Sequence, residues 1–320
     1  MLKQSALVLW GLGAFYSNGF AATSLNKKSP IPDGIESVGG HGEAFSNSGM
    51  AALTDISAVR LNPAMMTALT AYQVGGTIHW PSGGRNYYQL GVVDPTTSPG
   101  VAAGVMMTTS SETLPNPEKD QKKFLEAVQF DDPGERRFTI GLAQAFAKVS
   151  VGLSFIHAEG YDQNDGKWEK VSGSGLGGGI AALLSTSIRV GASVENINGE
   201  KIKNLAPKTI RYGIAGLWGE GAVTTQIDYK ERDRIRDEVI LGATSKERSI
   251  TGSATATVQN TLRLIVSYGQ TLASESPIRF AAGGVAIVNN GFTLAYHTSR
   301  KDLTKSNLHQ AVSLGLDVRM

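Results

Sequence analysis

From about Ala71 onward, apolar and polar residues alternate with a period of two in one segment after another. The segments are separated by clusters of Gly, Asn, Asp, Pro and Ser, which are typical of turns. Such alternation predicts β-strands rather than helices. The fourteen segments are Tyr72–Trp80, Asn86–Val93, Val101–Thr109, Arg137–Phe146, Val149–His157, Gly173–Leu184, Ile188–Glu195, Thr209–Trp218, Ala222–Lys230, Val239–Thr244, Leu262–Gly269, Ile278–Ile287, Phe292–Thr298 and Leu308–Met320. Ser253–Val258 is either an extra strand or an extension of a neighbouring strand, so we expect an all-β chain of about 14 strands, within a range of 12 to 16.

The two faces of these segments differ in chemistry. In the fourth segment one face carries Phe138, Ile140 and Leu142, whereas the other carries Arg137 and Thr139. A membrane barrel turns its apolar face toward lipid, because a charge that faces hydrocarbon near the midplane costs about 2–4 kcal/mol. A soluble β-sandwich also alternates, with the apolar face inward. The long run of strands, the missing helices and the N-terminal leader described below favour a transmembrane antiparallel β-barrel over a soluble periplasmic β-protein.

Short and long connections between the segments alternate, as they do in outer-membrane barrels. The short connections include residues 185–187, 219–221 and 288–291, and the long ones include residues 110–135, 159–172 and 196–208. We expect the short set to face the periplasm and the long set to face the cell exterior, where it meets lipopolysaccharide.

The N-terminus has the pattern of a signal peptide. Lys3 precedes an apolar stretch from Ala6 to Phe15, and the small residues Gly19 and Ala21 stand where signal peptidase cleaves. The apolar stretch is too short to cross about 30 Å of hydrocarbon, although an uncleaved anchor remains the alternative. We therefore expect export to the outer membrane of a Gram-negative bacterium, with cleavage after Ala21.

Residues 22–70 have a different character from the rest of the chain. They contain Pro30, Pro32 and Pro63, show short helix-like stretches and lack strand alternation. The expected organisation is a signal peptide at 1–21, an N-terminal plug at 22–70 and a barrel at 71–320.

Composition excludes several function classes. The chain has no Cys, which removes disulfides, thiolate metal sites and cysteine nucleophiles. Its formal net charge of +2 argues against nucleic acid as a partner. The 38 Gly residues, without a collagen-like period, suit turns and close contacts between strands.

Motifs for catalysis are weak. Gly173, Gly175 and Gly178 match the dinucleotide pattern, but they lie in a segment that we interpret as a strand instead of in a strand–turn–helix unit. The five histidines lack metal spacing, and no G-x-S-x-G sequence occurs. We therefore expect no enzyme activity, no metal and no cofactor. The run of mixed charges from Lys230 to Glu238 is interpreted as a solvated loop, or alternatively as a lipopolysaccharide site.

Charged residues in the middle of strands are the better candidates for a site. If the apolar face meets lipid, five arginines point into the lumen, namely Arg137, Arg189, Arg211, Arg263 and Arg279. They need acidic partners there, such as Glu195, Asp228, Asp317 or groups of the N-terminal segment. Arg189, Arg211, Arg263 and Asp228 are the candidates for holding a ligand, and a purely structural network that anchors the plug is the alternative.

The segment before the first strand resembles a family signature. Its residues are Gly39-Gly40-His41-Gly42-Glu43-Ala44, Gly49-Met50-Ala51, Asp55-Ile56-Ser57-Ala58-Val59 and Asn62-Pro63-Ala64. Their order and spacing resemble those of the FadL/TodX family of outer-membrane transporters for hydrophobic compounds and of the related PorV-type barrels. The resemblance implies a fourteen-stranded barrel with an inward-folded plug, in which Gly49, Asp55, Asn62, Pro63 and Ala64 form the plug motif.

The resemblance also implies a function. Transporters of this family carry long-chain fatty acids or aromatic hydrocarbons through the lumen, and so passive uptake of a hydrophobic or amphipathic small molecule is expected here. PorV-type relatives imply the alternative, a scaffold barrel that helps to assemble or secrete surface proteins. The last segment ends in an apolar face that resembles the pattern recognised by the barrel-assembly machinery; the face consists of Val312, Leu314, Leu316, Val318 and Met320.

Overall fold

The computed structural model describes a defined part of the chain. The described residues are 49–53, 55–81, 86–110, 115–120, 122–123, 134–164, 167–203, 205–219, 222–233, 246–259, 261–272, 277–300, 303 and 308–318. The expected signal peptide, residues 22–48 of the expected plug and the expected strand at residues 239–244 lie outside this part.

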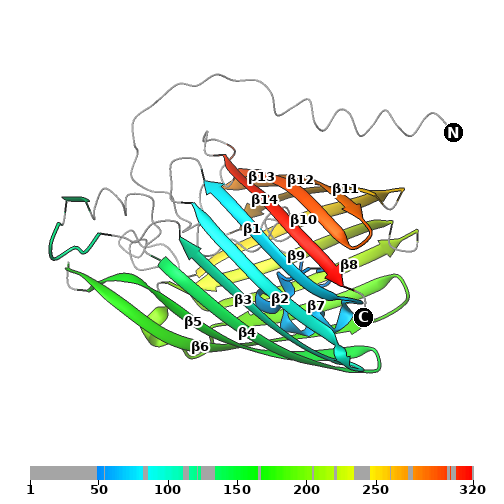
Figure 1. Ribbon diagram of the computed structural model, residues 1–320, viewed down its shortest axis with the longest axis horizontal. Helices are drawn as coiled ribbons and strands as arrows, with labels where there is room; N and C mark the ends of the chain where they lie inside the picture. Colours follow the sequence, from blue (N-terminus) through cyan, green and yellow to red (C-terminus); the bar gives the residue numbers. More distant parts are fainter. Residues whose placement is uncertain are drawn as a thin grey trace, which may run out of the picture.

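The described residues form a closed barrel of 14 antiparallel strands (Figure 1). The strands are β1 (Tyr72–Pro81), β2 (Tyr87–Ser98), β3 (Val101–Ser110), β4 (Gly134–Phe146), β5 (Val149–Asn164), β6 (Lys167–Leu183), β7 (Ile188–Glu195), β8 (Thr209–Trp218), β9 (Val223–Asp233), β10 (Lys246–Val258), β11 (Leu262–Thr271), β12 (Arg279–Asn289), β13 (Phe292–Arg300) and β14 (His309–Val318). Each strand pairs with its neighbours in the chain, and β1 pairs with β14 from Tyr72↔Val318 to Pro81↔His309, which closes the sheet. The expected fold class and strand count are confirmed.

One strand lies where the sequence did not place it. The tenth strand is Lys246–Val258, and it includes the stretch 253–258 that the sequence left as an extra strand or an extension. Its first residues are charged on both faces, with Lys246 and Arg248 outward and Glu247 buried. Glu247 pairs with a buried arginine of β9. The sequence prediction missed the start of this strand because Lys246 and Arg248 stand at outward positions, where the prediction relied on apolar residues.

The outer surface of the barrel is apolar. Leu153 is 72% exposed and Val266 is 61% exposed, whereas Arg137 and Thr139 on the opposite faces of their strands are 2% and 0% exposed. This arrangement confirms the expected face assignment, with apolar side chains outward and charged side chains inward. In the described part of the chain, no helix is both long enough and apolar enough to cross a membrane.

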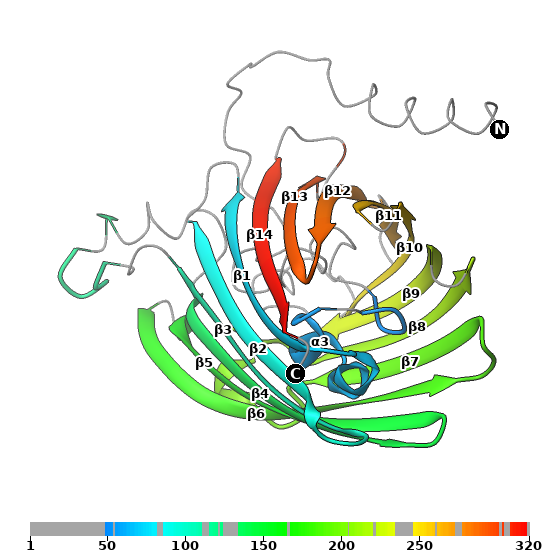
Figure 2. The same ribbon diagram turned by 45° about the vertical axis from the view of Figure 1, so that its right-hand side comes forward.

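The described residues of the expected plug lie inside the barrel, as Figure 2 shows around α3. They contain one turn of helix, α3 (Ala58–Leu61), followed by the 3-10 helix η1 (Pro63–Ala68). Apolar side chains of this segment form a buried cluster with the barrel wall, which includes Met50, Leu53, Val59, Leu61, Met65 and Met66. We refer to residues 49–70 as the plug segment.

Glycines on the inner face of eight successive strands make room for the plug segment. They stand opposite one another in four cross-strand pairs, Gly75↔Gly91, Gly104↔Gly141, Gly152↔Gly179 and Gly191↔Gly213. A Cβ atom at Gly104 would lie 2.6 Å from Val59 Cγ2, and one at Gly152 would lie 2.5 Å from the backbone nitrogen of Ala64. We call these eight residues the glycine track. At each of the eight positions a Cβ atom would lie 3.0 Å or less from an atom of the plug segment.

The connection between β7 and β8 also folds inward. It contains the short 3-10 helix η2 (Glu200–Ile202), and Ile202 packs with Leu205, Ala206 and Ala158 in a second buried cluster. Gly173 lies against Ile202, so a β6 glycine that matched the dinucleotide pattern serves close packing inside a strand.

Candidate functional site

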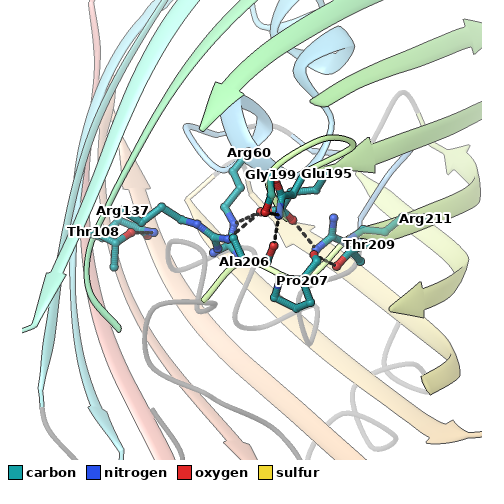
Figure 3. A network of polar contacts seen from close by, with 11 residues as sticks. Arg60, Thr108, Arg137, Glu195, Gly199, Ala206, Pro207, Thr209 and Arg211 are labelled. Atoms are coloured by element: carbon teal, nitrogen blue, oxygen red, sulfur yellow. Dashed lines mark hydrogen bonds and ion pairs between the residues drawn. The ribbon is translucent and has the colours of Figure 1, made fainter. Parts of the chain in front are cut away.

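Three arginines converge on one buried glutamate inside the barrel (Figure 3). Arg60 Nε of the plug segment lies 3.0 Å from Glu195 Oε1, and Arg137 Nη2 of β4 lies 3.4 Å from the same oxygen. Arg211 Nη2 of β8 donates to Glu195 Oε2 at 3.0 Å. All four side chains are at most 6% exposed. We call this group the Glu195 cluster.

The Glu195 cluster ties the plug segment to the wall. Removing one partner of such a buried ion pair is strongly destabilising, because the remaining charge stays buried. Each of the three arginines also makes further interactions besides its contact with Glu195. Arg211, one of the candidates for ligand binding, therefore serves the structural network that the sequence gave as the alternative. Arg60 was not predicted as a residue of this network, because it lies in a segment that has no strand alternation.

Asp228 anchors the first described residues of the plug segment. Its two carboxylate oxygens accept hydrogen bonds from the backbone N–H groups of Gly49, at 3.1 Å, and Met50, at 3.0 Å. Gly49 has a φ of 110°, which favours glycine. The glycine track leaves space beside this contact at Gly213, where a Cβ atom would collide with the Asp228 carboxylate. Asp228, a candidate ligand residue, thus binds the plug segment.

The remaining plug-motif residues also contact the wall. Asn62 Nδ2 donates to the backbone oxygens of Met50, at 2.8 Å, and Ile180, at 3.2 Å. Pro63 and Ala64 pack against Gly152 of β5. Four residues of the expected motif therefore contact the inner wall of the barrel, namely Gly49, Asn62, Pro63 and Ala64.

Asp55 has two roles in the plug segment. Its Oδ1 accepts from the backbone N–H of Ser57, the N-cap residue of α3, at 3.1 Å. It is also an electrostatic neighbour of Arg263 on β11, together with Asp317 on β14. Arg263 thus has one acid of the plug segment and one acid of the wall as electrostatic neighbours.

The other two arginines named from the sequence behave differently. Arg189 is half-buried near the start of β7, and no ion pair to it is found among the described residues. Arg279 is exposed at the start of β12, on the outward face that it shares with Val285. The expectation that Arg279 faces the lumen is wrong, because Arg279 shares its face of β12 with the large apolar residues Val285 and Ile287, which point outward. The inward set is Phe280, Ala282, Gly284 and Ala286.

Part of the mixed-charge run belongs to a strand rather than to a loop. Lys230–Asp233 continue β9, and Arg232 there is 2% exposed. Arg232 Nη2 donates to Glu247 Oε2 of β10 at 2.8 Å. The expectation of a solvated loop is wrong for these four residues, while residues 234–238 lie outside the described part.

The inner wall of β9 to β13 carries mostly small, uncharged polar groups. They include Gln226, Thr251, Ser253, Ser267 and Ser299, all buried. Ile156 of β5 and Ile265 of β11 are apolar exceptions that face inward. The interior therefore offers hydrogen-bonding groups beside apolar side chains. Most of its charged side chains contact an oppositely charged side chain or the plug segment.

Comparison with known proteins identifies the architecture. No family model and no curated protein matches the sequence. Among solved structures, the toluene transporter TodX of P. putida is similar with a TM-score of 0.59 and 13% identity, over 89% of this chain and 100% of that chain. The CymD monoaromatic hydrocarbon channel has a TM-score of 0.58 and 13% identity, over 89% and 99% of the two chains. A FadL homologue of Pseudomonas aeruginosa has a TM-score of 0.57 and 11% identity, over 88% and 98%. The resemblance to FadL/TodX architecture that residues 39–64 predicted is confirmed at the level of the fold.

Proposed function

We propose that this protein is an outer-membrane channel through which hydrophobic small molecules diffuse passively. The observation that carries the proposal is a 14-stranded barrel with an apolar exterior and an inward-folded plug segment, in an architecture shared along almost the full length of toluene and monoaromatic hydrocarbon channels. Apolar solutes cross a lipopolysaccharide layer slowly, and a water-filled pore does not favour them, so a shielded protein route is useful to the cell. Delivery by a signal peptide cleaved after Ala21 is part of this proposal.

The interior disfavours a fatty-acid carboxylate as the preferred head group. Arg211 is paired with Glu195, and Arg263 has Asp55 and Asp317 as neighbours. At either of these two arginines a carboxylate would have to displace an acid, which leaves a buried acid without its counterion. Arg189, for which no ion pair is found among the described residues, is only half-buried near the start of β7. We therefore propose that the transported molecules are uncharged hydrophobic compounds rather than long-chain fatty acids.

A scaffold barrel is the second candidate. It is supported by the same Glu195 cluster, since a plug segment held by buried ion pairs and by Asp228 suits a barrel that never conducts. In that case the partner would be a surface or secretion protein, and the interior would bind no solute.

Binding to the purified full-length protein separates the two candidates. The protein should be recovered from the outer-membrane fraction and should bind toluene saturably in a detergent that does not compete for the interior. Unlabelled p-xylene should displace the toluene, whereas glycerol should not. Absence of saturable binding, together with stable co-purification of a secretion complex, would favour the scaffold instead.

A further inference from the structure

Three uncharged polar side chains stand together on the inner wall of β9 and β10. Gln226 and Ser253 are directly opposite in the strand register, and Thr255 follows Ser253 on the same face. Directly opposite residues in an antiparallel pair have Cα atoms about 5 Å apart. The three side chains are therefore neighbours on one patch of the inner wall.

Gln226 and Ser253 are buried and Thr255 is half-buried, and all three have unused hydrogen-bonding capacity. Gln226 is 4% exposed and Ser253 is 9% exposed. Within the described part of the chain, no partner is found for Gln226 Oε1 and Nε2, Ser253 Oγ or Thr255 Oγ1. Ser267, the next inward residue along the same row, differs because its hydroxyl donates to the Ala282 carbonyl. A buried polar group without a partner is destabilising, so a wall that keeps several of them is suited to a partner that arrives from outside.

The surroundings of the three side chains select for an uncharged and mainly apolar partner. Asp228 lies two residues from Gln226 on the same face of β9, and its carboxylate would repel an anion. Ala215 is opposite Gln226 and Ile265 is opposite Thr255, and both are 1% exposed and inward. The polar groups thus have apolar side chains directly beside them.

We propose that Gln226, Ser253 and Thr255 form a subsite for the hydroxyl or carbonyl group of an otherwise apolar, uncharged molecule, such as a phenol or an alcohol. The subsite rests on the proposed function and gives that function a substrate class: hydrophobic compounds with one neutral hydrogen-bonding group. The Gln226 amide both donates and accepts, and each hydroxyl does the same, so either kind of head group is satisfied.

The subsite also adjoins the plug segment. A Cβ atom at Gly49 would lie 3.5 Å from Gln226 Nε2, and the Gly49 backbone is the group that Asp228 anchors. A bound head group would therefore sit at the edge of the plug segment, next to the end of the glycine track at Gly213 of β8, the strand that pairs with β9.

A matched pair of probes tests this subsite. p-Cresol and p-xylene have nearly the same shape and differ in one hydroxyl group. The binding constants of both are measured on purified full-length wild type and on the variants Gln226→Leu, Ser253→Ala and Thr255→Val. Ser267→Ala is the control, since it removes a hydroxyl of the same wall that already has a partner. Comparing each variant with wild type for each probe cancels the difference in water solubility.

The expected result is selective. Gln226→Leu and Ser253→Ala should weaken p-cresol binding about tenfold, the size of effect expected for lost neutral hydrogen bonds, and leave p-xylene binding unchanged or stronger. Ser267→Ala should change neither. If all the variants bind p-cresol as wild type does, or lose both probes equally, the subsite is wrong while p-xylene binding by wild type still supports the hydrocarbon channel. If wild type binds neither probe, both the subsite and the proposed function are overturned.

Discussion

At the residue scale, single carboxylates decide how the plug segment is held. Alternation along the strands predicted that Arg137, Arg211 and Asp228 face inward, and they do. It could not predict which groups meet, because partners such as Glu195 and Arg60 are 135 residues apart in the chain and are joined only by barrel closure. The sequence therefore predicted which side chains face inward, but not which of them form ion pairs.

Replacing Glu195 by Gln tests the Glu195 cluster. The change keeps the side-chain volume but leaves three buried guanidinium groups without this counterion, so we expect a loss of stability of at least about 3 kcal/mol. Urea unfolding in lipid vesicles, followed by tryptophan fluorescence, measures it. Glu231→Gln is the control, because Glu231 forms its ion pairs with Lys246 and Arg248 on the outer face. Equal small effects of both changes would show that the Glu195 cluster does not hold the fold.

Replacing Asp228 by Asn tests the anchor of the plug segment. The neutral amide keeps one acceptor oxygen and loses the charge-assisted bonds to the Gly49 and Met50 N–H groups, so local opening should become about tenfold more frequent. A cysteine in place of Met50 reports the opening through its labelling rate with a thiol reagent, since the chain has no native Cys. An unchanged labelling rate in the double variant would contradict the anchor.

At the element scale, the glycine track shows what the sequence could and could not predict. The excess of glycine indicated close contacts between strands. The pairing of glycines across four strand pairs depends on register, which the sequence did not fix. The start of the tenth strand was missed for a different reason, since Lys246 and Arg248 stand at its outward positions in place of apolar residues.

Two glycine variants separate packing against the plug segment from simple strand effects. Gly191→Val should displace the plug segment, because even a Cβ atom there would overlap the Met50 carbonyl oxygen. Gly252→Val is the matched control: it lies within β10, and no atom lies within 4 Å of its Cβ position. Limited proteolysis of the folded protein in detergent should cut the plug segment in the first variant only. Equal protection in both would mean that the track is not a contact surface.

At the scale of the whole molecule, strand number and closure followed from the sequence, because both depend on a repeated pattern instead of on any one contact. Closure requires the last strand to bond with the first, and residues 309–318 do so along β1. An open edge would leave backbone polar groups unpaired in hydrocarbon.

Deleting residues 316–320 tests closure. The deletion removes the partners of the first residues of β1, Tyr72 to Val74, and part of the apolar C-terminal face expected to be recognised by the assembly machinery. We expect loss of the heat-modifiable folded band on gels and at least a severalfold drop in the outer-membrane fraction. Normal folded levels of the shortened protein would show that these residues are dispensable for closure.

The most direct test of the central claim is the initial rate of p-xylene uptake by intact cells with and without the gene. Cells that carry the wild-type protein should take up p-xylene at a severalfold higher initial rate than cells without it, while glycerol uptake should be the same in both strains. Equal p-xylene uptake in the two strains, at verified wild-type levels of folded protein in the outer membrane, would contradict the claim that this barrel is a route for hydrophobic molecules.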